Sequence, residues 1–187
     1  MLLTLSCNFF AQNADKIIDV RDGKTYPVTK INNQTWMAEN LAFKTDNGCF
    51  AYDNDTSNIL KYGCLYYLET AKNICPAGWH LPTDTEWDLL DSYLGFTGAT
   101  ANKLKSLKGW LGENEQSTNE SGFTALPGGF LSFNGKFNNE GNSGYWWCFP
   151  EHNSDKSTYR FIDNRYNSLQ GTSSVKKYAF SVRCVKD

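Results

Sequence analysis

Apolar residues occur along much of the chain in short runs, and turn-forming residues separate these runs. Such a pattern is typical of β-strands. Residues 17–30 predict two short strands joined at Asp22-Gly23, a dipeptide that favours a hairpin turn. Because Pro27 has no amide proton, the second of these strands is expected at a sheet edge or at a bulge. Residues 31–41 predict a polar turn followed by a further apolar strand.

Helical spacing is clearest after Thr83. The segment Thr83-Asp84-Thr85-Glu86 has the pattern of a capping box, in which the Thr83 hydroxyl accepts from the Glu86 amide and the Glu86 carboxylate accepts from the Thr83 amide. Apolar residues then recur at three- and four-residue spacing and end at a glycine. This predicts a short amphipathic helix built on Trp87, Leu90, Leu94 and Gly95.

The rest of the chain predicts one more short helix and a long irregular β region. Residues 63–74 begin with aromatic strand formers and continue with helical spacing, and residues 101–107 predict a second short helix. Polar residues 48–58 and 109–122 predict surface loops. Strands are expected at residues 145–148, 159–162 and 179–185, with a bend at 123–130. Strands, two short helices and then antiparallel strands predict an α+β fold for residues 13–187 as a single domain.

Composition and charge narrow the classes of protein and partner to be expected. A chain of 187 residues with 40% hydrophobic and 20% charged residues is typical of one globular domain. The net charge of −2 argues against a nucleic-acid partner. No segment approaches the roughly 18 apolar residues that a membrane-spanning helix needs, so no membrane span is expected. The aromatic share of 15% indicates that large rings supply much of the buried area.

Residues 1–12 resemble the end of a secretion signal, with a cleavage point after Ala11. No Lys or Arg precedes the apolar run, and a buried first strand is the alternative. Lipidation of Cys7 is a weaker possibility, because Thr4 stands where such signals carry Leu. The expected location is therefore outside the cytoplasm: extracellular, periplasmic or tethered to the cell surface.

Six cysteines also point to an oxidising compartment. None forms a Cys-x-x-Cys pair, and neither histidine lies at zinc-ligand spacing from a cysteine pair. Disulfides are therefore expected in place of a metal site. If Cys7 leaves with the signal, five cysteines remain, and one of them is free or pairs outside the chain.

Several motifs in a fixed order resemble a known family, the Fibrobacter succinogenes major paralogous domain. The resemblance extends from about residue 17 to the end of the chain. It implies a fold similar to that of C-type lectins, in the branch shared with the formylglycine-generating enzyme, and an origin among exported and surface proteins of Bacteroidetes and Fibrobacteres. The family's molecular function is largely unassigned. The motifs are Trp36-Met37-Ala38-Glu39-Asn40-Leu41, Cys75-Pro76-Ala77-Gly78-Trp79-His80-Leu81-Pro82-Thr83, Glu86-Trp87, Phe123, Leu126-Pro127-Gly128-Gly129 and Ser181-Val182-Arg183-Cys184-Val185.

The resemblance also suggests disulfide pairings. A long bridge that ties the helical half of such a fold to its last strand corresponds to Cys75–Cys184. Cys64 and Cys148 stand where the family usually has Arg and Ser, and two unexpected cysteines suggest a second bridge, Cys64–Cys148. Cys49 is then the free cysteine, or it pairs with Cys64 instead.

No catalytic residue is predicted. A general base needs a positioned partner, and the sequence gives His80 none, so we expect backbone hydrogen bonds to hold His80 in a turn. Glu86 is expected to cap a helix and not to act in catalysis. The formylglycine-generating enzyme uses a reactive cysteine pair, but Cys148 has no close second thiol. The tripeptides with which C-type lectins hold calcium are absent. Asp53, Asn54 and Asp55 carry oxygens of the kind that bind calcium, which is the alternative for this loop, but a solvated turn is expected. No cofactor and no metal are predicted.

The C-terminal loops carry the candidate ligand contacts. Aromatic rings beside amides and an arginine are typical of surfaces that recognise a glycan or a protein. Because side chains alternate along a strand, at most one of Trp146 and Trp147 can face solvent, and Trp147 is expected inside. The sequence thus favours a non-catalytic binding domain for an extracellular glycan or protein. A structural accessory domain, or a hydrolytic or redox enzyme using His80 or Cys148, is the alternative. The candidate contacts are Tyr145, Trp146, His152, Tyr159, Arg165 and Tyr166.

Overall fold

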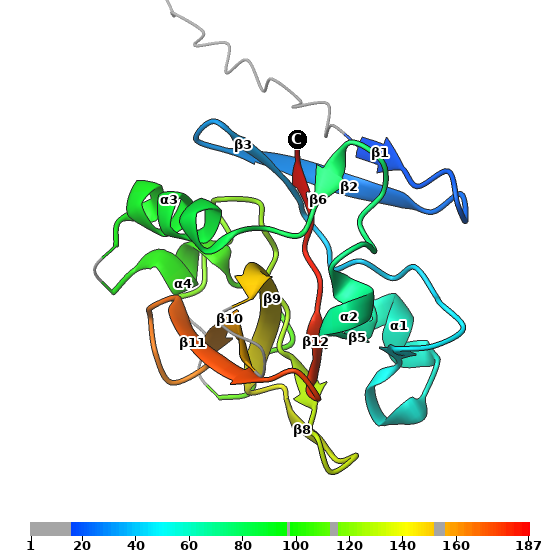
Figure 1. The fold of residues 1–187 in the computed structure, drawn as a ribbon. Coiled ribbons are helices and arrows are strands. Elements are labelled where there is room, and N and C mark those ends of the chain that lie inside the picture. Colours follow the sequence, from blue (N-terminus) through cyan, green and yellow to red (C-terminus); the bar gives the residue numbers. More distant parts are fainter. Residues whose placement is uncertain (1–15, 97, 113–115, 152–155) are drawn as a thin grey trace, which may run out of the picture.

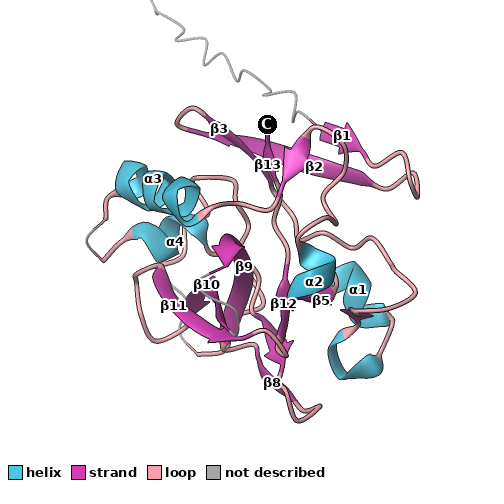
Figure 2. Ribbon diagram, in the orientation of Figure 1, coloured by secondary structure: helices cyan, strands magenta, loops and turns pink. Residues whose placement is uncertain are grey.

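The computed structural model describes residues 16–187 except 97, 113–115 and 152–155. The predicted leader at residues 1–12, with Cys7, and the candidate contact His152 lie outside these residues. The predicted α+β class is confirmed: short helices accompany two sheets, and strands dominate (Figure 2).

The smaller sheet contains the predicted N-terminal hairpin. Its strands follow the order β1-β2-β3-β13-β6, and the β1–β2 turn includes Gly23 at φ 76°. Pro27 was expected at a sheet edge or a bulge, but β2 has a neighbour on each side and pairs with β1 in continuous register. Pro27 lies opposite Lys16, the first residue of the short strand β1. The bounds are β1 Lys16–Ile18, β2 Thr25–Ile31, β3 Gln34–Met37, β6 Trp79–His80 and β13 Val185–Lys186.

The larger sheet has the order β11-β10-β9-β7-β12-β5-β4, and β8 pairs with β7. Most of its pairs are antiparallel, as predicted, but β9 pairs in parallel with both β7 and β12. The bounds are β4 Cys49–Phe50, β5 Leu65–Tyr67, β7 Gly128–Leu131, β8 Phe137–Glu140, β9 Ser143–Glu151, β10 Lys156–Asp163, β11 Gln170–Val175 and β12 Ala179–Ser181.

Two pairs of helices lie on opposite sides of β12, with α1 and α2 on one side and α3 and α4 on the other (Figure 1). The predicted loop at residues 48–58 instead contains β4, a 3-10 turn at Tyr52–Asn54 and the start of α1. Sequence periodicity missed α1 because it spans less than two turns. The bounds are α1 Ser57–Tyr62, α2 Leu68–Ala71, α3 Asp84–Leu94 and α4 Thr100–Leu104.

The predicted capping box of α3 is confirmed. The Thr83 hydroxyl accepts from the Glu86 amide at 3.2 Å, and Glu86 Oε2 accepts from the Thr83 amide at 2.8 Å. These two bonds satisfy amides that the first helical turn leaves without partners. Gly95, at φ 121°, ends the helix, and Trp87, Leu90 and Leu94 are buried, as their spacing predicts.

The strand expected at residues 179–185 divides between the two sheets. Its first part is β12 in the larger sheet and its end is β13 in the smaller one. The connecting residues keep extended pairing, since the Leu41 amide donates to the Val182 carbonyl at 2.9 Å and the Met37 amide donates to the Cys184 carbonyl at 3.0 Å. One extended segment thereby joins both sheets.

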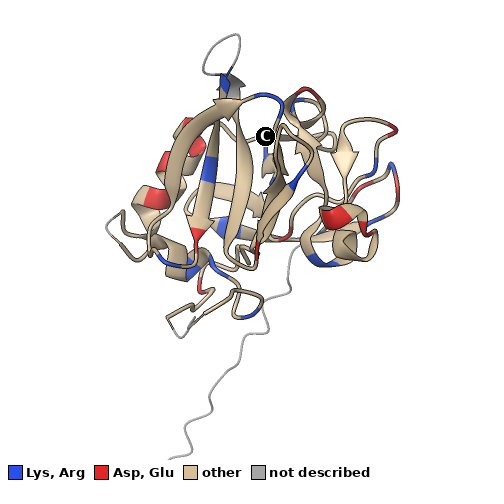
Figure 3. Cartoon of the chain, turned by 90° about the horizontal axis from the view of Figure 1, so that it is seen from below, with Lys and Arg blue, Asp and Glu red and all other residues tan. Residues whose placement is uncertain are grey.

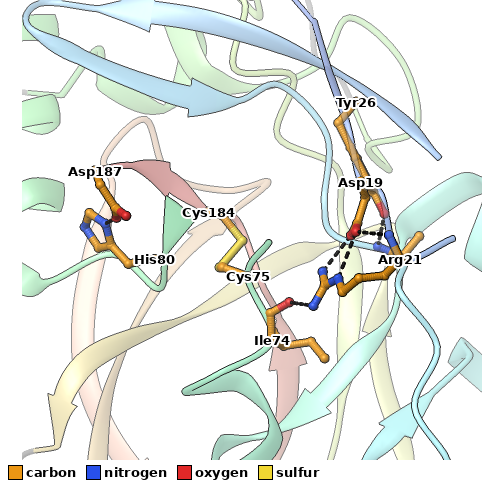
Figure 4. The surroundings of a disulfide bond; sticks show 9 residues. Asp19, Arg21, Tyr26, Ile74, Cys75, His80, Cys184 and Asp187 are labelled. Atoms are coloured by element: carbon orange, nitrogen blue, oxygen red, sulfur yellow. Dashed lines mark hydrogen bonds and ion pairs between the residues drawn. A yellow bond between two sulfur atoms is a disulfide. The ribbon is translucent and has the colours of Figure 1, made fainter. Parts of the chain in front are cut away.

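The Cys75–Cys184 disulfide implied by the family resemblance is confirmed (Figure 4). It fixes the connecting segment to the chain that leads into β6. On the residue before Cys75, the Ile74 carbonyl accepts from Arg21 Nη1 at 2.8 Å, while Arg21 also pairs with Asp19 at 2.6 Å. The N-terminal hairpin, the disulfide and the last strand therefore meet at one place.

Side chains on the two faces of β9 enter separate cores. Trp147 packs with Phe180 and Leu68 in one core, whereas Trp146 packs with Trp87 and other residues of the α3 side in the second. Both indoles are completely buried. Both faces of β9 are covered, and strand alternation therefore leaves neither indole in solvent.

The separation of the two cores shows that the predicted Cys64–Cys148 disulfide is wrong. Cys64 belongs to the Trp147 core and Cys148 to the Trp146 core, and both thiols are free. Cys148 is completely buried, and this desolvation is the main reason its pKa is well above the ordinary thiol value. A buried thiol with a raised pKa is a poor nucleophile, which argues against the redox alternative at Cys148.

Candidate functional site

A polar hollow of about 260 Å³ lies at one end of the larger sheet, where the β8–β9 turn meets the loop that follows β10. Asn139 near the end of β8 and Gly141 in the turn both have positive φ, and the Asn164 amide donates to the Asn142 carbonyl at 2.8 Å. The strand pairing therefore brings two distant loops together. The lining residues are Asn139, Asn142, Ser143, Asp163, Asn164 and Arg165.

Asp163 is the buried carboxylate that lines this hollow. It pairs in register with Ser143, whose hydroxyl donates to Asp163 Oδ2 at 2.9 Å. Arg165 donates to Asp163 Oδ1 from Nε at 2.8 Å and from its amide at 2.9 Å. Burial alone would raise the pKa of Asp163, but hydrogen bonds from Arg165 and Ser143 outweigh it and hold the pKa below its ordinary value. The carboxylate is therefore ionised at neutral pH and orients the arginine.

Three asparagines form the rim. Asn164 Nδ2 donates to the Leu111 carbonyl at 2.9 Å and to Asn142 Oδ1 at 3.2 Å, which fixes the orientation of these two amides. Asn139 Nδ2 donates to the Tyr145 hydroxyl at 2.7 Å. Within the described residues, Asn139 Oδ1 and Arg165 Nη1 have no hydrogen-bond partner. The hollow thus offers both an acceptor and a donor to a ligand.

Tyr145 connects the hollow to a half-buried aromatic face on the larger sheet. Its ring stacks on Phe161 at 5.8 Å and on Phe180 at 5.6 Å. The predicted contact Tyr159 belongs to the same face, with its ring 4.6 Å from Phe180, and burial raises the pKa of its hydroxyl. The Tyr145 ring is fixed in place, and its hydroxyl stands beside an amide.

Arg165 and Tyr166 are the most exposed of the predicted contacts that the structure describes. The Arg165 guanidinium lies over the Tyr166 ring at 5.5 Å, and half of the Tyr166 surface is exposed. The structure therefore brings Tyr145, Arg165 and Tyr166 to one end of the sheet. In the molecule as a whole, charged residues of both signs lie mainly on loops and helices, and the strands carry few (Figure 3).

Trp146 is a correction to the predicted contacts. Its indole is completely buried, and its Nε1 donates to Asn40 Oδ1 at 2.8 Å inside the protein. A surface ligand cannot reach it. The indole instead connects β9 to the segment that follows β3.

Asn139, Ser143, Asp163 and Asn164 were missed by the sequence interpretation. Asn142-Ser143 and Asp163-Asn164 each lie at the end of a predicted strand, where polar residues are typical of turns. Only the pairing of Ser143 with Asp163 shows that the two ends meet. No local pattern contains that register.

His80 lines a second hollow, of about 440 Å³, together with Lys72 and Asn73 just after α2 and Thr83 at the start of α3. Side-chain carboxylates hold the ring, not the backbone bonds that were expected. Nδ1 lies 2.7 Å from Asp187 Oδ1 (Figure 4), and Nε2 lies 2.8 Å from Glu86 Oε1. Burial alone would lower the pKa of His80, but hydrogen bonds to both carboxylates raise it. Since both ring nitrogens are occupied, neither is free to accept a substrate proton.

Across the part of the chain that the structure describes, no group of three or more His, Cys, Asp or Glu residues could hold a metal ion. In the loop at residues 53–55, Asp55 instead accepts from the Ser57 amide at 2.9 Å, at the start of α1. None of the described helices has the length and apolar character needed to cross a membrane.

Neither curated proteins nor solved structures yield a match to this chain. A family model does match, over residues 29–186, which is most of the chain and includes the larger sheet, part of the smaller sheet, the disulfide and the polar hollow. The chain therefore belongs to the Fibrobacter succinogenes major domain family.

Proposed function

We propose that this protein is a non-catalytic carbohydrate-binding domain that recognises a glycan through the polar hollow beside Tyr145. The observation that carries the proposal is the arrangement of three asparagine amides around an ion pair, next to a fixed tyrosine. Sugar hydroxyls both donate and accept hydrogen bonds, and amides offer both functions. A rigid ring that carries a polar group suits the alternating apolar and polar faces of a sugar.

The proposal extends to the fold and to the location of the protein. We assign the C-type-lectin-like fold on the basis of the Cys75–Cys184 disulfide, which joins the segment before α3 to the segment between β12 and β13. The disulfide also supports export to an oxidising compartment, because such bonds persist there and are rare in the cytosol. Neither inference depends on the identity of the ligand.

The polar hollow itself argues for binding over catalysis. Its single carboxylate already accepts from Arg165 and Ser143, so Asp163 is held as an anion and is poorly placed to exchange protons. A general acid or base needs a pKa near the working pH, and the pKa of Asp163 is lowered from a value already far below it.

The test is a glycan array followed by calorimetry on the best ligand. Tyr145→Phe removes only a hydroxyl, and Asn139→Asp replaces the amide donor while keeping a similar shape. Arg165→Gln removes the cation. Each change is expected to weaken glycan binding about tenfold or more, which corresponds to about 1.4 kcal/mol.

Lys30→Gln is the matched control, because Lys30 is exposed on β2 of the smaller sheet. It is expected to leave the affinity unchanged. Unaltered binding by all three site variants would show that the hollow is not the site. If the wild-type chain binds no glycan on the array, the carbohydrate proposal fails and a protein ligand or a structural role takes its place.

A further inference from the structure

Cys49 and Cys64 meet at the edge of the larger sheet. Cys49 pairs with Tyr66 across the antiparallel β4–β5 ladder, and Cys64 lies two residues before Tyr66. Cys64 directly precedes β5, and continuing the alternation of the strand by one residue places it diagonally across from Cys49. A hydrogen bond also joins the two thiols. Both thiols are free, and Cys49 packs against the core that contains Cys64.

The two thiols have different surroundings. Cys64 is completely buried, whereas Cys49 is partly exposed. A hydrogen bond from Cys64, together with the Thr45 amide and the charge of Lys44, lowers the pKa of Cys49 to about 7 despite partial burial. The same interaction and burial raise the pKa of Cys64. One thiolate is therefore accessible, and a second thiol stands beside it.

We propose that Cys49 and Cys64 form a second, reversible disulfide by exchange with an external small-molecule disulfide such as oxidised glutathione. This site is independent of the proposed glycan hollow.

The reaction needs two exchanges. The Cys49 thiolate attacks one sulfur of the external disulfide, so that a bond from Cys49 to that sulfur forms and the other half leaves as a thiol. The mixed disulfide removes the Cys49 thiolate, whose interaction is the largest cause of the raised pKa of Cys64, whereas the raised pKa of Cys148 comes mainly from burial. Cys64 then loses its proton, attacks the Cys49 sulfur and expels the remaining half as a second thiol. Two cysteines are oxidised to one disulfide, one external disulfide is reduced to two thiols, and the cysteine protons pass to these leaving groups.

The position of β4 permits the small movement that the bond requires. Diagonal neighbours on paired strands lie about 7–8 Å apart, whereas a disulfide spans roughly 4.4–6.8 Å between Cα atoms. β4 consists only of Cys49–Phe50 and is the last strand in its sheet, with β5 as its neighbour. It can therefore approach Cys64 without disturbing a second strand pair.

Cysteine mapping by mass spectrometry tests the proposal on the full chain. All variants carry Cys7→Ser, so that the reactions observed belong to the described cysteines. After incubation with oxidised glutathione and alkylation of the remaining thiols, we expect a cross-linked peptide that joins Cys49 to Cys64. In Cys64→Ser, glutathione should instead remain on Cys49 as a stable mixed disulfide. Cys148→Ser is the matched control and should behave like the parent.

The pH dependence of Cys49 alkylation gives a second measurement. We expect a midpoint near pH 7 in the parent and an upward shift in Cys64→Ala, because alanine removes the hydrogen-bond donor beside Cys49. A chain isolated with the bridge already formed supports the proposal. A lasting glutathione adduct on Cys49 in the parent, or a cross-link from Cys64 to another cysteine, would overturn it.

Discussion

Arg183 is held inside the protein by Asn40. The guanidinium donates to Asn40 Oδ1 from Nη2 at 2.7 Å and from Nε at 3.1 Å, and the side chain is completely buried. Carbonyls of Met37, Phe123 and Thr124 accept its remaining bonds. The cation thus has a set of neutral acceptors, and burial lowers its pKa to about 9.

Asn40→Ala is expected to destabilise the fold strongly. The change removes the acceptor shared by Arg183 and Trp146, and it frees the Tyr62 carbonyl to which Asn40 Nδ2 donates. A hydrogen bond to a charged group contributes about 1.5–3 kcal/mol, so we expect a loss of about 3 kcal/mol in the free energy of unfolding. Urea unfolding measures it as a lower midpoint at unchanged slope.

Asn33→Ala serves as the control for this substitution, because Asn33 is exposed in the β2–β3 turn. Its effect should stay within about 0.5 kcal/mol. An Asn40→Ala variant that unfolds at the same urea concentration as Asn33→Ala would show that the buried guanidinium does not depend on this amide.

The disulfide is expected to contribute more than any single hydrogen bond. Cys75 and Cys184 are 109 residues apart, and closing a loop of that length lowers the free energy of the folded state relative to the unfolded chain by about 4–5 kcal/mol in the chain-entropy model. The double variant Cys75→Ala, Cys184→Ala should therefore melt well below the parent. Calorimetry checks this, and a melting temperature equal to that of the parent would contradict it.

The capping box can be tested by substitutions at Thr83 that separate the contribution of its hydroxyl to stability from that of its backbone amide. Thr83→Ala removes the acceptor for the Glu86 amide and should cost about 1 kcal/mol, whereas Thr83→Ser keeps the hydroxyl and most of the stability. Thermal unfolding followed by circular dichroism compares the two. Equal stability of the Ala and Ser variants would mean that the Glu86 carboxylate alone caps α3.

Local features of the fold could be predicted from the sequence because the groups involved are close in the chain. The box at Thr83 and Glu86 lies within one helical turn, and the Asp22-Gly23 turn joins adjacent strands. The division of residues 179–185 between two sheets could not, because it depends on pairing with β3 and β5, far away in the sequence.

The same limit applied to the candidate site: residues with a local signal could be predicted, and residues whose role depends on long-range pairing could not. Tyr145 and Arg165 were found because aromatic and cationic residues in loops are typical of binding surfaces. Asp163 was missed because its role comes from its register with Ser143. Trp146 was misplaced because the sequence shows alternation along β9 but not that both of its faces are covered.

Protonation of His80 is expected to make the stability of the fold depend on pH. Burial opposes protonation of the ring, but hydrogen bonds to Asp187 and Glu86 outweigh it and raise the pKa above 6.5. The folded protein therefore holds the proton more tightly than the unfolded chain does. Its stabilisation is fully present below pH 6.5 and is lost as the pH rises through the folded-state pKa.

Cys49 acts in the opposite direction over a neighbouring range, because its lowered pKa adds stability as the pH rises from about 7. The measurement therefore uses a Cys49→Ser background, with urea unfolding at a series of pH values. We expect the free energy of unfolding to fall above pH 6.5 in this background and the fall to disappear when His80→Gln is added. Proton NMR of the His80 ring should give a midpoint above 6.5, and a midpoint at or below that value would mean that the two carboxylates do not stabilise the imidazolium.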